Sequence, residues 1–246
     1  MKIQAINNNY SKYSKPVANP SFKSFYREVK ADSSKVLWRN NTTFFRNDLA
    51  WTDLAKFLKD KYAKTDKVNV FMYACSNGLE AYSFLMKMFT CFNENFVKKF
   101  TPIIAKDFDS FPISVAKKKM VDIEPVEVER INFHTNDNFD EYFSKITKLE
   151  NKYQPSEKLT KLVEFDVGDF TEEYKDLPKD NTILFVRNCW PYFPTKMQEE
   201  LPKKLYEHLG KNSTVIVGNF DYYLLGLFEY KSYGFKPTSV PNVYEK

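Results

Sequence analysis

Glycine and histidine are scarce in this chain of 246 residues, which contains six glycines and two histidines. A dinucleotide-binding loop requires several closely spaced glycines, and the first candidate loop contains only Gly78, so this type of loop is excluded. His134 and His208 are too few to form a histidine-rich metal cluster. We therefore expect no bound metal.

Cysteine is also rare, and long apolar runs are absent. Cys75, Cys91 and Cys189 are far apart and form no Cys-x-x-Cys pair, so neither a disulfide framework nor a zinc site is expected. No apolar run approaches the roughly 20 residues that a membrane helix needs, and no signal peptide is visible. We expect a soluble, cytoplasmic protein without membrane insertion.

Charge of neither sign predominates in the sequence. The 37 basic residues are interspersed with 32 acidic ones, and the net charge is +5. A nucleic-acid surface would need a basic stripe, so no nucleic-acid partner is expected. We interpret the basic run at residues 117–119 as the solvated end of a helix rather than as a phosphate site.

Hydrophobic residues make up 43% of the chain, which is enough for a packed core in one domain. Residues 1–21 are polar and lack periodicity, and we predict a disordered tail there. Residues 22–246 are predicted to form a single domain, with a small insert around residues 121–162. Ordered structure is expected to begin with a short helix at residues 22–29.

The stretch from Val68 to Met88 predicts a strand, a turn and a helix. An apolar run at residues 68–74 suits a buried parallel strand. Turn-prone residues follow at 75–78, and apolar residues then recur at helical spacing. Such a unit opens nucleotide-type folds, where the ligand lies at the carboxyl end of the strand. Any α/β domain contains a similar unit, so this stretch alone identifies no ligand.

A second strand is predicted at residues 102–106, directly before Asp107. An acidic residue at the end of the second strand typically binds ribose hydroxyls. The alternative is that the acidic residues here only cap the helix predicted at residues 112–120.

Further strands are predicted at residues 162–165, 182–186 and 213–218, and further helices at residues 139–149 and 195–209. Residues 125–133 alternate in a strand-like way. Because strands and helices alternate along most of the chain, we predict an α/β fold with a mainly parallel sheet and helices on both faces.

Polar clusters follow several of these strands, where a ligand crevice is expected in an open α/β sheet. Together with the loop before the first long helix, they resemble motifs of the CheR-type S-adenosylmethionine-dependent methyltransferases, which methylate glutamate side chains of chemotaxis receptors. The motifs are TTFFR at residues 42–46, SNGLEAYS at 76–83, DFD at 107–109, GDF at 168–170 and FVRNCWPYF at 185–193. The resemblance spans residues 38–246, including a final strand at Val243 and Tyr244.

The resemblance implies a Rossmann-like class I methyltransferase fold with a seven-stranded sheet, and S-adenosylmethionine as the cofactor. A loop that closes over the cofactor would contain Asn40, Thr42 and Arg46, with Arg46 near the amino-acid end of the cofactor. Glu80 would accept the ammonium group of this end. Gly78 would let the backbone pass close to the cofactor.

Further cofactor contacts are implied by the later motifs. Asp107 would bind the ribose hydroxyls, and Asp169 and Phe170 would flank the adenine. Arg187 and Asn188 would line the other side of the cofactor.

The implied reaction transfers a methyl group to the carboxylate of a protein glutamate and leaves S-adenosylhomocysteine. A glutamate titrates near about 4.3, so it is ionised at neutral pH and needs no general base. Alignment and desolvation would be the main contributions of the enzyme. Tyr192 would point toward the methyl group, and Arg46 and Tyr192 would orient the incoming carboxylate. The protein partner would be a chemoreceptor, and we expect the chain itself to be a monomer.

The sequence departs from the family pattern at several positions. Leu79 and Ala81 replace an acid and a proline, Asp169 replaces an asparagine, Pro191 replaces an aliphatic residue, and residues 218–221 replace Gly-His-Ser-Glu. The helical N-terminal domain of the family has no counterpart in this sequence, so the sequence does not define the acceptor. Two alternatives therefore remain: methyl transfer to another acceptor, and a regulatory module that binds S-adenosylmethionine without catalysis.

Overall fold

The structure is a computed structural model of the chain, and it describes residues 26–31, 34–39, 42–219, 221 and 233–246. Two expectations lie outside the described residues. They are the disordered tail at residues 1–21 and the cofactor contact of Asn40.

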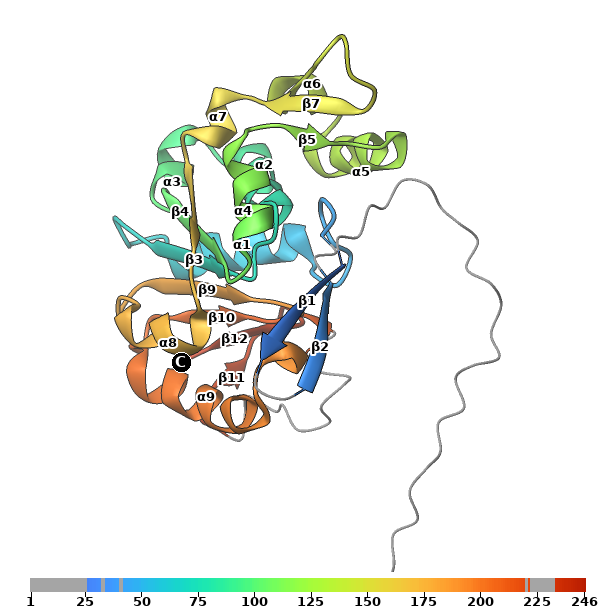
Figure 1. Cartoon of the computed structure of the whole chain (residues 1–246). Coiled ribbons are helices and arrows are strands. Elements are labelled where there is room, and N and C mark those ends of the chain that lie inside the picture. Colours follow the sequence, from blue (N-terminus) through green and yellow to red (C-terminus); the bar gives the residue numbers. More distant parts are fainter. Residues whose placement is uncertain (1–25, 32–33, 40–41, 220, 222–232) are drawn as a thin grey trace, which may run out of the picture.

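A seven-stranded sheet forms the centre of the molecule (Figure 1), with the order β11-β12-β10-β9-β3-β4-β8. Strands β10, β9, β3, β4 and β8 are parallel, whereas β12 is antiparallel to both of its neighbours. The strands are β3 (Asn69–Tyr73), β4 (Ile103–Asp107), β8 (Val163–Val167), β9 (Thr182–Val186), β10 (Thr214–Ile216), β11 (Lys236–Pro237) and β12 (Val243–Glu245). The predicted mainly parallel, seven-stranded α/β fold is therefore confirmed.

The central strands are rich in apolar residues, and they are covered by side chains on both faces. In β3, Val70 and Met72 join one hydrophobic cluster, whereas Tyr73 joins a second cluster. In β9, Ile183 belongs to the first cluster and Leu184 to the second. Successive side chains of a strand point to opposite faces, so the two clusters lie on the two sides of the sheet.

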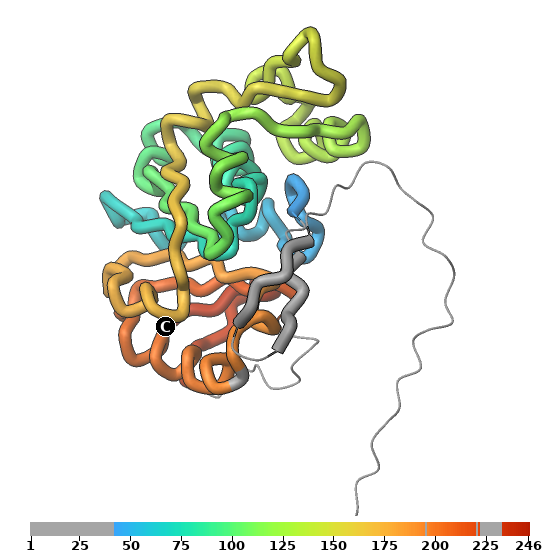
Figure 2. Tube along the Cα trace, viewed as in Figure 1, coloured from blue at the N-terminus to red at the C-terminus, as the bar shows by residue number. Residues whose placement is uncertain are grey.

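Helices cover both faces of the sheet, as the ribbon in Figure 1 and the tube in Figure 2 show. Residues of α1 (Trp51–Lys61), α2 (Leu79–Cys91), α3 (Glu94–Lys98) and α4 (Ser110–Lys117) pack into the first cluster. Residues of α8 (Phe170–Glu173) and α9 (Thr195–His208) pack into the second. The expected cover of helices on both faces is therefore present.

A three-stranded antiparallel sheet with the order β5-β7-β6 lies between α4 and β8 in the sequence. The strands are β5 (Val121–Asp122), β6 (Phe143–Lys145) and β7 (Lys152–Pro155). The helices of the same segment are α5 (Pro125–Thr135), α6 (Phe139–Tyr142) and α7 (Glu157–Thr160). We call residues 121–160 the insert. In Figure 1 the insert lies at the top of the molecule, and α5 contacts α2.

The strand predicted at residues 125–133 is wrong, because these residues form helix α5. Pro125 stands in the first turn, where its missing N–H is not needed, and Glu124 and Glu127 form a capping box. The helix buries Glu127 and Ile131, which are four residues apart, and leaves Val126 exposed. The alternating valines therefore did not indicate a strand.

Two predicted helices also differ from the structure. The helix expected at residues 139–149 ends at Tyr142, because Phe143 pairs with Pro155 in the insert sheet. The helix expected at residues 22–29 is replaced, over its described part, by strand β1 (Tyr26–Ala31), which pairs with β2 (Ser34–Arg39). Local periodicity carries no information about such pairing partners.

The other predicted strands and helices are found close to their expected positions. The strands expected at residues 68–74, 102–106, 162–165, 182–186 and 213–218 correspond to β3, β4, β8, β9 and β10, and the helix expected at 195–209 corresponds to α9. Within the described ranges, no helix combines the length and the hydropathy needed to span a membrane.

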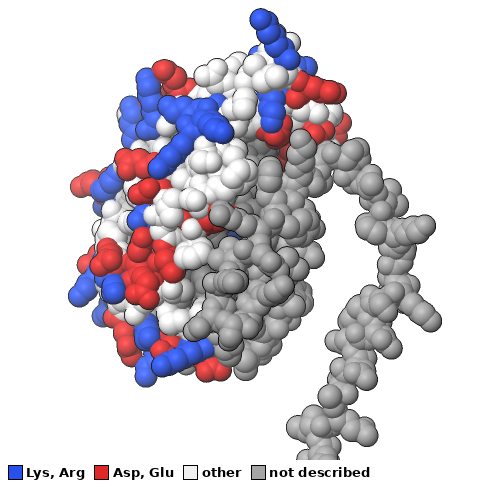
Figure 3. Space-filling view, viewed as in Figure 1, with Lys and Arg blue, Asp and Glu red and all other residues white. Residues whose placement is uncertain are grey.

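Charged side chains of both signs are spread over the face shown in Figure 3. The basic run at residues 117–119 is exposed at the end of α4, as interpreted from the sequence. Lys117 pairs with Asp166 at 3.4 Å, and Lys161 pairs with Glu157 at 2.6 Å. Exposed pairs of this kind add little to stability.

Helix α2 depends on its buried aromatic contacts, and replacing Phe84 tests this. Phe84 packs edge-on against Phe100 and Phe185, with ring centroids 6.4 and 5.4 Å away. Phe84→Ala should lower the free energy of unfolding in urea by about 3–5 kcal/mol, because it removes contacts and leaves a cavity. The control Phe133→Ala, at a side chain that is 81% exposed, should change it by less than about 0.5 kcal/mol. Equal effects of the two substitutions would contradict the packing described here.

Candidate functional site

The carboxyl ends of β3, β4, β8 and β9 lie side by side at one edge of the sheet. Tyr73 is paired with Lys106 and Val186, and Asp107 is paired with Val167. The segments that begin at these strand ends contain the motifs at residues 76–83, 107–109, 168–170 and 185–193. The fold therefore gathers these motifs at the edge where open α/β sheets bind ligands.

The turn between β3 and α2 depends on Gly78. Its φ of +89° is left-handed, a conformation that favours glycine. The ring of Phe165, from β8, occupies the space beside it, so a Cβ at this position would overlap that ring. The turn and the packing therefore both require glycine here, and the close approach of Gly78 to the cofactor stays a prediction.

Asp107 joins the loops after β3 and β4. Its Oδ2 accepts a hydrogen bond from the Ser76 N–H at 2.7 Å, and its Oδ1 accepts one from the Asp109 N–H at 2.9 Å. The side chain is buried, and this burial raises its pKa, although both N–H bonds oppose the shift. The helix α4 is capped by Asp109, which accepts from the Phe111 N–H. Asp107 is therefore not the cap of α4. Its contact with the ribose hydroxyls stays a prediction.

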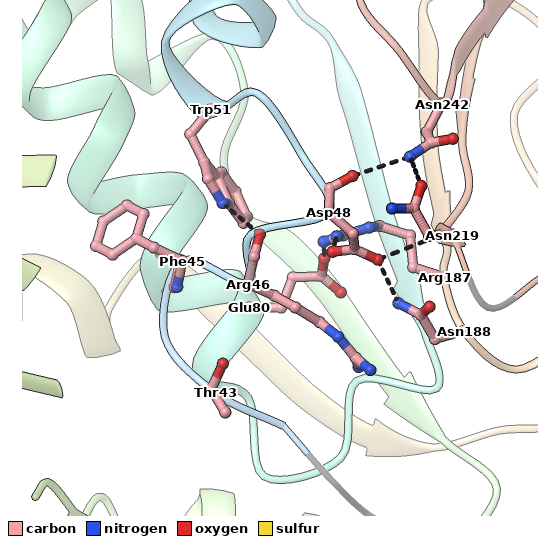
Figure 4. A network of polar contacts seen from close by, with 12 residues as sticks. Thr43, Phe45, Arg46, Asp48, Trp51, Glu80, Arg187, Asn188, Asn219 and Asn242 are labelled. Carbon is pink, nitrogen blue, oxygen red and sulfur yellow. Dashed lines mark hydrogen bonds and ion pairs between the residues drawn. The ribbon is translucent and has the colours of Figure 1, made fainter. Parts of the chain in front are cut away.

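A buried arginine forms the centre of the site (Figure 4). The Arg187 side chain is 1% exposed, and its two terminal nitrogens donate to Glu80 and to Asp48. Burial lowers the pKa of Arg187 to about 10, and the charge of Asp48 opposes this shift. The guanidinium therefore stays protonated at neutral pH, and it holds the start of α2 and the loop before α1 against the end of β9.

Asp48 connects three parts of the chain, although it was not among the predicted site residues. Besides the Arg187 contact, its Oδ2 accepts from the Asn188 side-chain amide at 3.0 Å and from the Asn219 N–H at 3.2 Å. Its carbonyl oxygen accepts from the Asn242 side-chain amide at 2.9 Å. Burial by itself raises the pKa of Asp48, but Arg187, Asn188 and Arg46 together hold it below its ordinary value. Asp48 is therefore ionised at neutral pH.

Asp221 holds the segment after β9 through hydrogen bonds from the backbone. Its carboxylate accepts from the backbone N–H groups of Asn188 at 2.6 Å, Trp190 at 3.0 Å and Gly218 at 2.7 Å. Burial raises its pKa to about 6. Asp221 was not among the predicted site residues, although residues 218–221 stand where the family has Gly-His-Ser-Glu. An acidic residue at the last position of both patterns was the signal that could have found Asp221.

The loop of the TTFFR motif is anchored by its two phenylalanines, which are buried. Phe45 has a left-handed φ of 45°, which costs about 1–2 kcal/mol in a residue other than glycine. The Trp51 indole N–H donates to the Arg46 carbonyl oxygen at 3.1 Å. The guanidinium of Arg46 is close enough to lower the pKa of Arg187, and Figure 4 shows Arg46 extending into the region of Glu80. Thr42, half-buried, begins the described part of this loop.

Asp169 and Phe170 lie where β8 leads into α8. Asp169 caps this helix, because its Oδ1 accepts from the Thr171 N–H at 2.9 Å and from the Thr171 hydroxyl at 2.7 Å. The Phe170 ring is buried against Tyr73, with centroids 4.9 Å apart, and near Trp190. The ring therefore serves the second hydrophobic cluster, and the contact of these two residues with adenine stays a prediction.

Tyr192 ends a short 3-10 helix (Trp190–Tyr192) in the segment that follows β9. Its N–H donates to the Cys189 carbonyl oxygen at 3.0 Å, and its side chain is half-buried. Pro191 suits the start of this turn, so its difference from the family pattern is compatible with the local backbone. The role of Tyr192 beside the reacting methyl group stays a prediction.

The sequence model of the CheR methyltransferase family, specifically its SAM-binding domain, matches residues 40–224 of this chain. The chain belongs to this family. A chemotaxis protein methyltransferase of Borreliella burgdorferi is 26% identical over 190 residues, which are 73% of this chain and 63% of that protein. The CheR-type chain described here therefore spans less than two thirds of this relative.

Solved methyltransferases overlap the structure more distantly. A TehB-like SAM-dependent methyltransferase from Corynebacterium glutamicum is 13% identical, with a TM-score of 0.41, over 78% of this chain and 86% of its own. PKMT2 from Rickettsia typhi, in complex with AdoHcy, is 14% identical, with a TM-score of 0.33, over 62% of this chain and 21% of its own. Overlaps at these TM-scores carry no weight for function.

S-adenosylmethionine is the cofactor of the family, and the residues of this site fit it. Each oxygen of Asp107 accepts one backbone N–H and retains capacity for a hydroxyl donor. Asn77 Oδ1 and Arg187 Nε are buried and have no hydrogen-bond partner within the described part of the chain. Buried polar atoms without partners are uncommon, and a bound polar group would satisfy them. Among the described residues, no cluster of His, Cys, Asp and Glu is arranged to hold a metal ion.

The raised pKa of Asp221 predicts a measurable pH dependence of stability. The folded pKa of about 6 lies above the ordinary aspartate pKa of 3.8, so the folded state binds more protons between these two values. The stabilisation from Asp221 is complete below about pH 4 and is lost as the pH rises through about 6. Urea unfolding of the wild type should show this loss, amounting to about 3 kcal/mol at most, and Asp221→Asn should lack it. Parallel pH profiles of the two proteins would contradict the assignment.

Proposed function

We propose that this chain transfers a methyl group from S-adenosylmethionine to the side-chain carboxylate of a glutamate in a protein, as in methylation of chemotaxis receptors. The observation that carries the proposal is the charge arrangement around Arg187. Two cations, Arg46 and Arg187, lie among two carboxylates, Asp48 and Glu80. Such a site can bind the zwitterionic amino-acid end of the cofactor without burying a net charge.

Each end of the cofactor has suitable residues. The Glu80 carboxylate, fixed by Arg187, would accept hydrogen bonds from the ammonium group at the amino-acid end. Asp107 would accept hydrogen bonds from the ribose hydroxyls. Phe108 follows Asp107 directly and is 49% exposed, and its ring could stack on the adenine. Phe108 was not among the residues predicted to bind the cofactor.

S-adenosylmethionine supplies a methyl group on a sulfonium, ready for displacement by a nucleophile. The acceptor carboxylate is ionised at neutral pH, so this chain's own residues need only bind and orient it. Arg46 is a cation beside the site and can pair with the carboxylate. Tyr192, from the segment after β9, could donate a hydrogen bond to it. Alignment of the two reacting groups would supply most of the acceleration.

The acceptor and the assembly are the parts of this proposal that rest on the family. The relative from Borreliella burgdorferi is named as a chemotaxis protein methyltransferase, and this name favours a receptor glutamate. The monomeric state and the cytoplasmic location stay predictions.

The acceptor is tested by incubating the purified chain with S-adenosylmethionine labelled in its methyl group and a cytoplasmic receptor fragment. Label should enter the fragment and should be released as methanol by mild alkali, because a glutamyl methyl ester is labile. A fragment with glutamine at its methylation sites is the control and should remain unlabelled. Alkali-stable label would indicate another acceptor, and binding of the cofactor without any transfer would indicate a non-catalytic module.

The cofactor site is tested at Asp107. Asp107→Ala removes the acceptor of two ribose hydroxyls, and hydrogen bonds to a charged group contribute about 1.5–3 kcal/mol each. Calorimetry should therefore show affinity for S-adenosylmethionine falling by roughly 100-fold or more. Asp166→Ala, at an exposed residue near the end of the neighbouring β8, is the matched control and should bind normally. Unchanged affinity of the Asp107 variant would rule out the ribose role.

A further inference from the structure

The residue before Arg46 is held in an unfavourable backbone conformation. Phe45 has a φ of 45°, in the left-handed region that a phenylalanine rarely adopts. Such a conformation persists only where surrounding contacts impose it, and residues of this kind concentrate at functional sites. The contacts that impose it therefore also determine where the Arg46 side chain starts.

Some of these contacts come from helices that pack on the central sheet. The Phe45 N–H donates to the Ser83 hydroxyl oxygen of α2 at 2.9 Å. The Ser83 hydroxyl itself donates to the Leu79 carbonyl oxygen at 2.7 Å, so its position is fixed. The Trp51 ring of α1 lies edge-on to the Phe45 ring, with centroids 5.6 Å apart.

The remaining contacts come from α5, in the insert. The His134 ring stacks on the Phe45 ring, with centroids 4.3 Å apart and an interplanar angle of 18°. The Arg130 guanidinium donates to the Phe44 carbonyl oxygen at 3.3 Å, and the Glu127 carboxylate accepts from the Phe44 backbone. Both peptide groups around Phe44 are thus bound by one helix.

The stacked ring of His134 acts through its shape rather than through a charge. Burial, together with the cations of Lys87 and Arg130, lowers the pKa of His134 to about 4, so the ring is neutral at pH 7. Its own backbone is fixed, because Lys87 of α2 donates to the His134 carbonyl oxygen at 3.0 Å. A flat, neutral ring in a fixed position can hold another ring against it.

We propose that helix α5 of the insert positions Arg46 for the reaction, with His134 and Arg130 as positioning residues that impose the conformation of Phe44 and Phe45. The insert then does more than add a surface to the domain. The contacts that the insert makes with the loop of the TTFFR motif determine where the Arg46 guanidinium lies at the reaction site. This inference rests on the role proposed above for Arg46, and it assigns positioning roles to His134 and Arg130, which lie outside the sequence motifs.

The first test measures the loop directly and needs no activity. In His134→Ala, hydrogen exchange of the peptide spanning residues 42–50 should be about tenfold faster than in the wild type, because the ring that holds Phe45 is gone. His134→Phe keeps a flat ring and should restore slow exchange. Glu129→Ala, at an exposed residue of the same helix, is the control and should exchange like the wild type. Unchanged exchange in His134→Ala would overturn the proposal.

The second test asks whether the loop acts through Arg46. His134→Ala should weaken binding of S-adenosylmethionine or raise KM for the acceptor by about 3–10-fold, with His134→Phe close to wild type. In an Arg46→Ala background the same substitution should have no further effect, because residues that act through one another are not additive. Additive losses would mean that His134 has only a structural role, and this result would overturn the proposal.

The two tests separate this proposal from the proposed function. If methyl transfer to a glutamate is absent but exchange and cofactor affinity respond to His134 as described, the acceptor assignment fails and the coupling stands. If transfer occurs and is insensitive to His134, the function stands and the coupling fails.

Discussion

The candidate site depends on the burial of one guanidinium. Arg187 is almost completely removed from water, and a charge in that position requires compensation. Asp48 and Glu80 provide it from two segments that are 139 and 107 residues away in the sequence. Removing one partner of a buried ion pair leaves an uncompensated charge and is strongly destabilising. The loop before α1, the start of α2 and the end of β9 are therefore fixed to one another by electrostatics as well as by packing.

Short polar side chains extend this arrangement around the edge of the sheet. Asp48 binds Asn188, Asn219 and Asn242, which lie near the ends of β9, β10 and β12. Asp221 binds the backbone on both sides of Asn188 and so shapes the segment that leads to the 3-10 helix. These residues need not touch a substrate, and they define the frame in which the residues that do so are placed. Amides and carboxylates suit this task because each can join several backbone groups.

The sequence predicted the central sheet well and the insert poorly, and the reason is physical. Strand β9 is buried at every position, and in β3 and β4 half-buried residues lie among the buried ones, so burial largely determines these strands. In α5, the capping box and Pro125 favoured a helix while Val126 and Val128 suggested a strand, and burial of Ile131 decided for the helix. Glu80 and Arg187 were found because each belongs to a short motif of neighbouring residues that resembles the family pattern. Asp48 and Asp221 were missed because their importance arises from partners distant in sequence.

Val121 at the start of the insert pairs with Tyr153 near its end, so the chain enters and leaves the insert at nearly the same place. The insert therefore has the connectivity of a segment inserted into a loop of the domain. Insertions at exposed loop tips are usually tolerated by the domain that receives them. Here the Phe44 ring lies against Phe143 of the insert, with centroids 5.4 Å apart, and the Phe45 ring lies against His134. Divergence of the insert is therefore limited by an aromatic pair that belongs to the host domain. Related proteins with a different insert would need matching substitutions at residues 44–45, so these residues and the insert should change together in evolution.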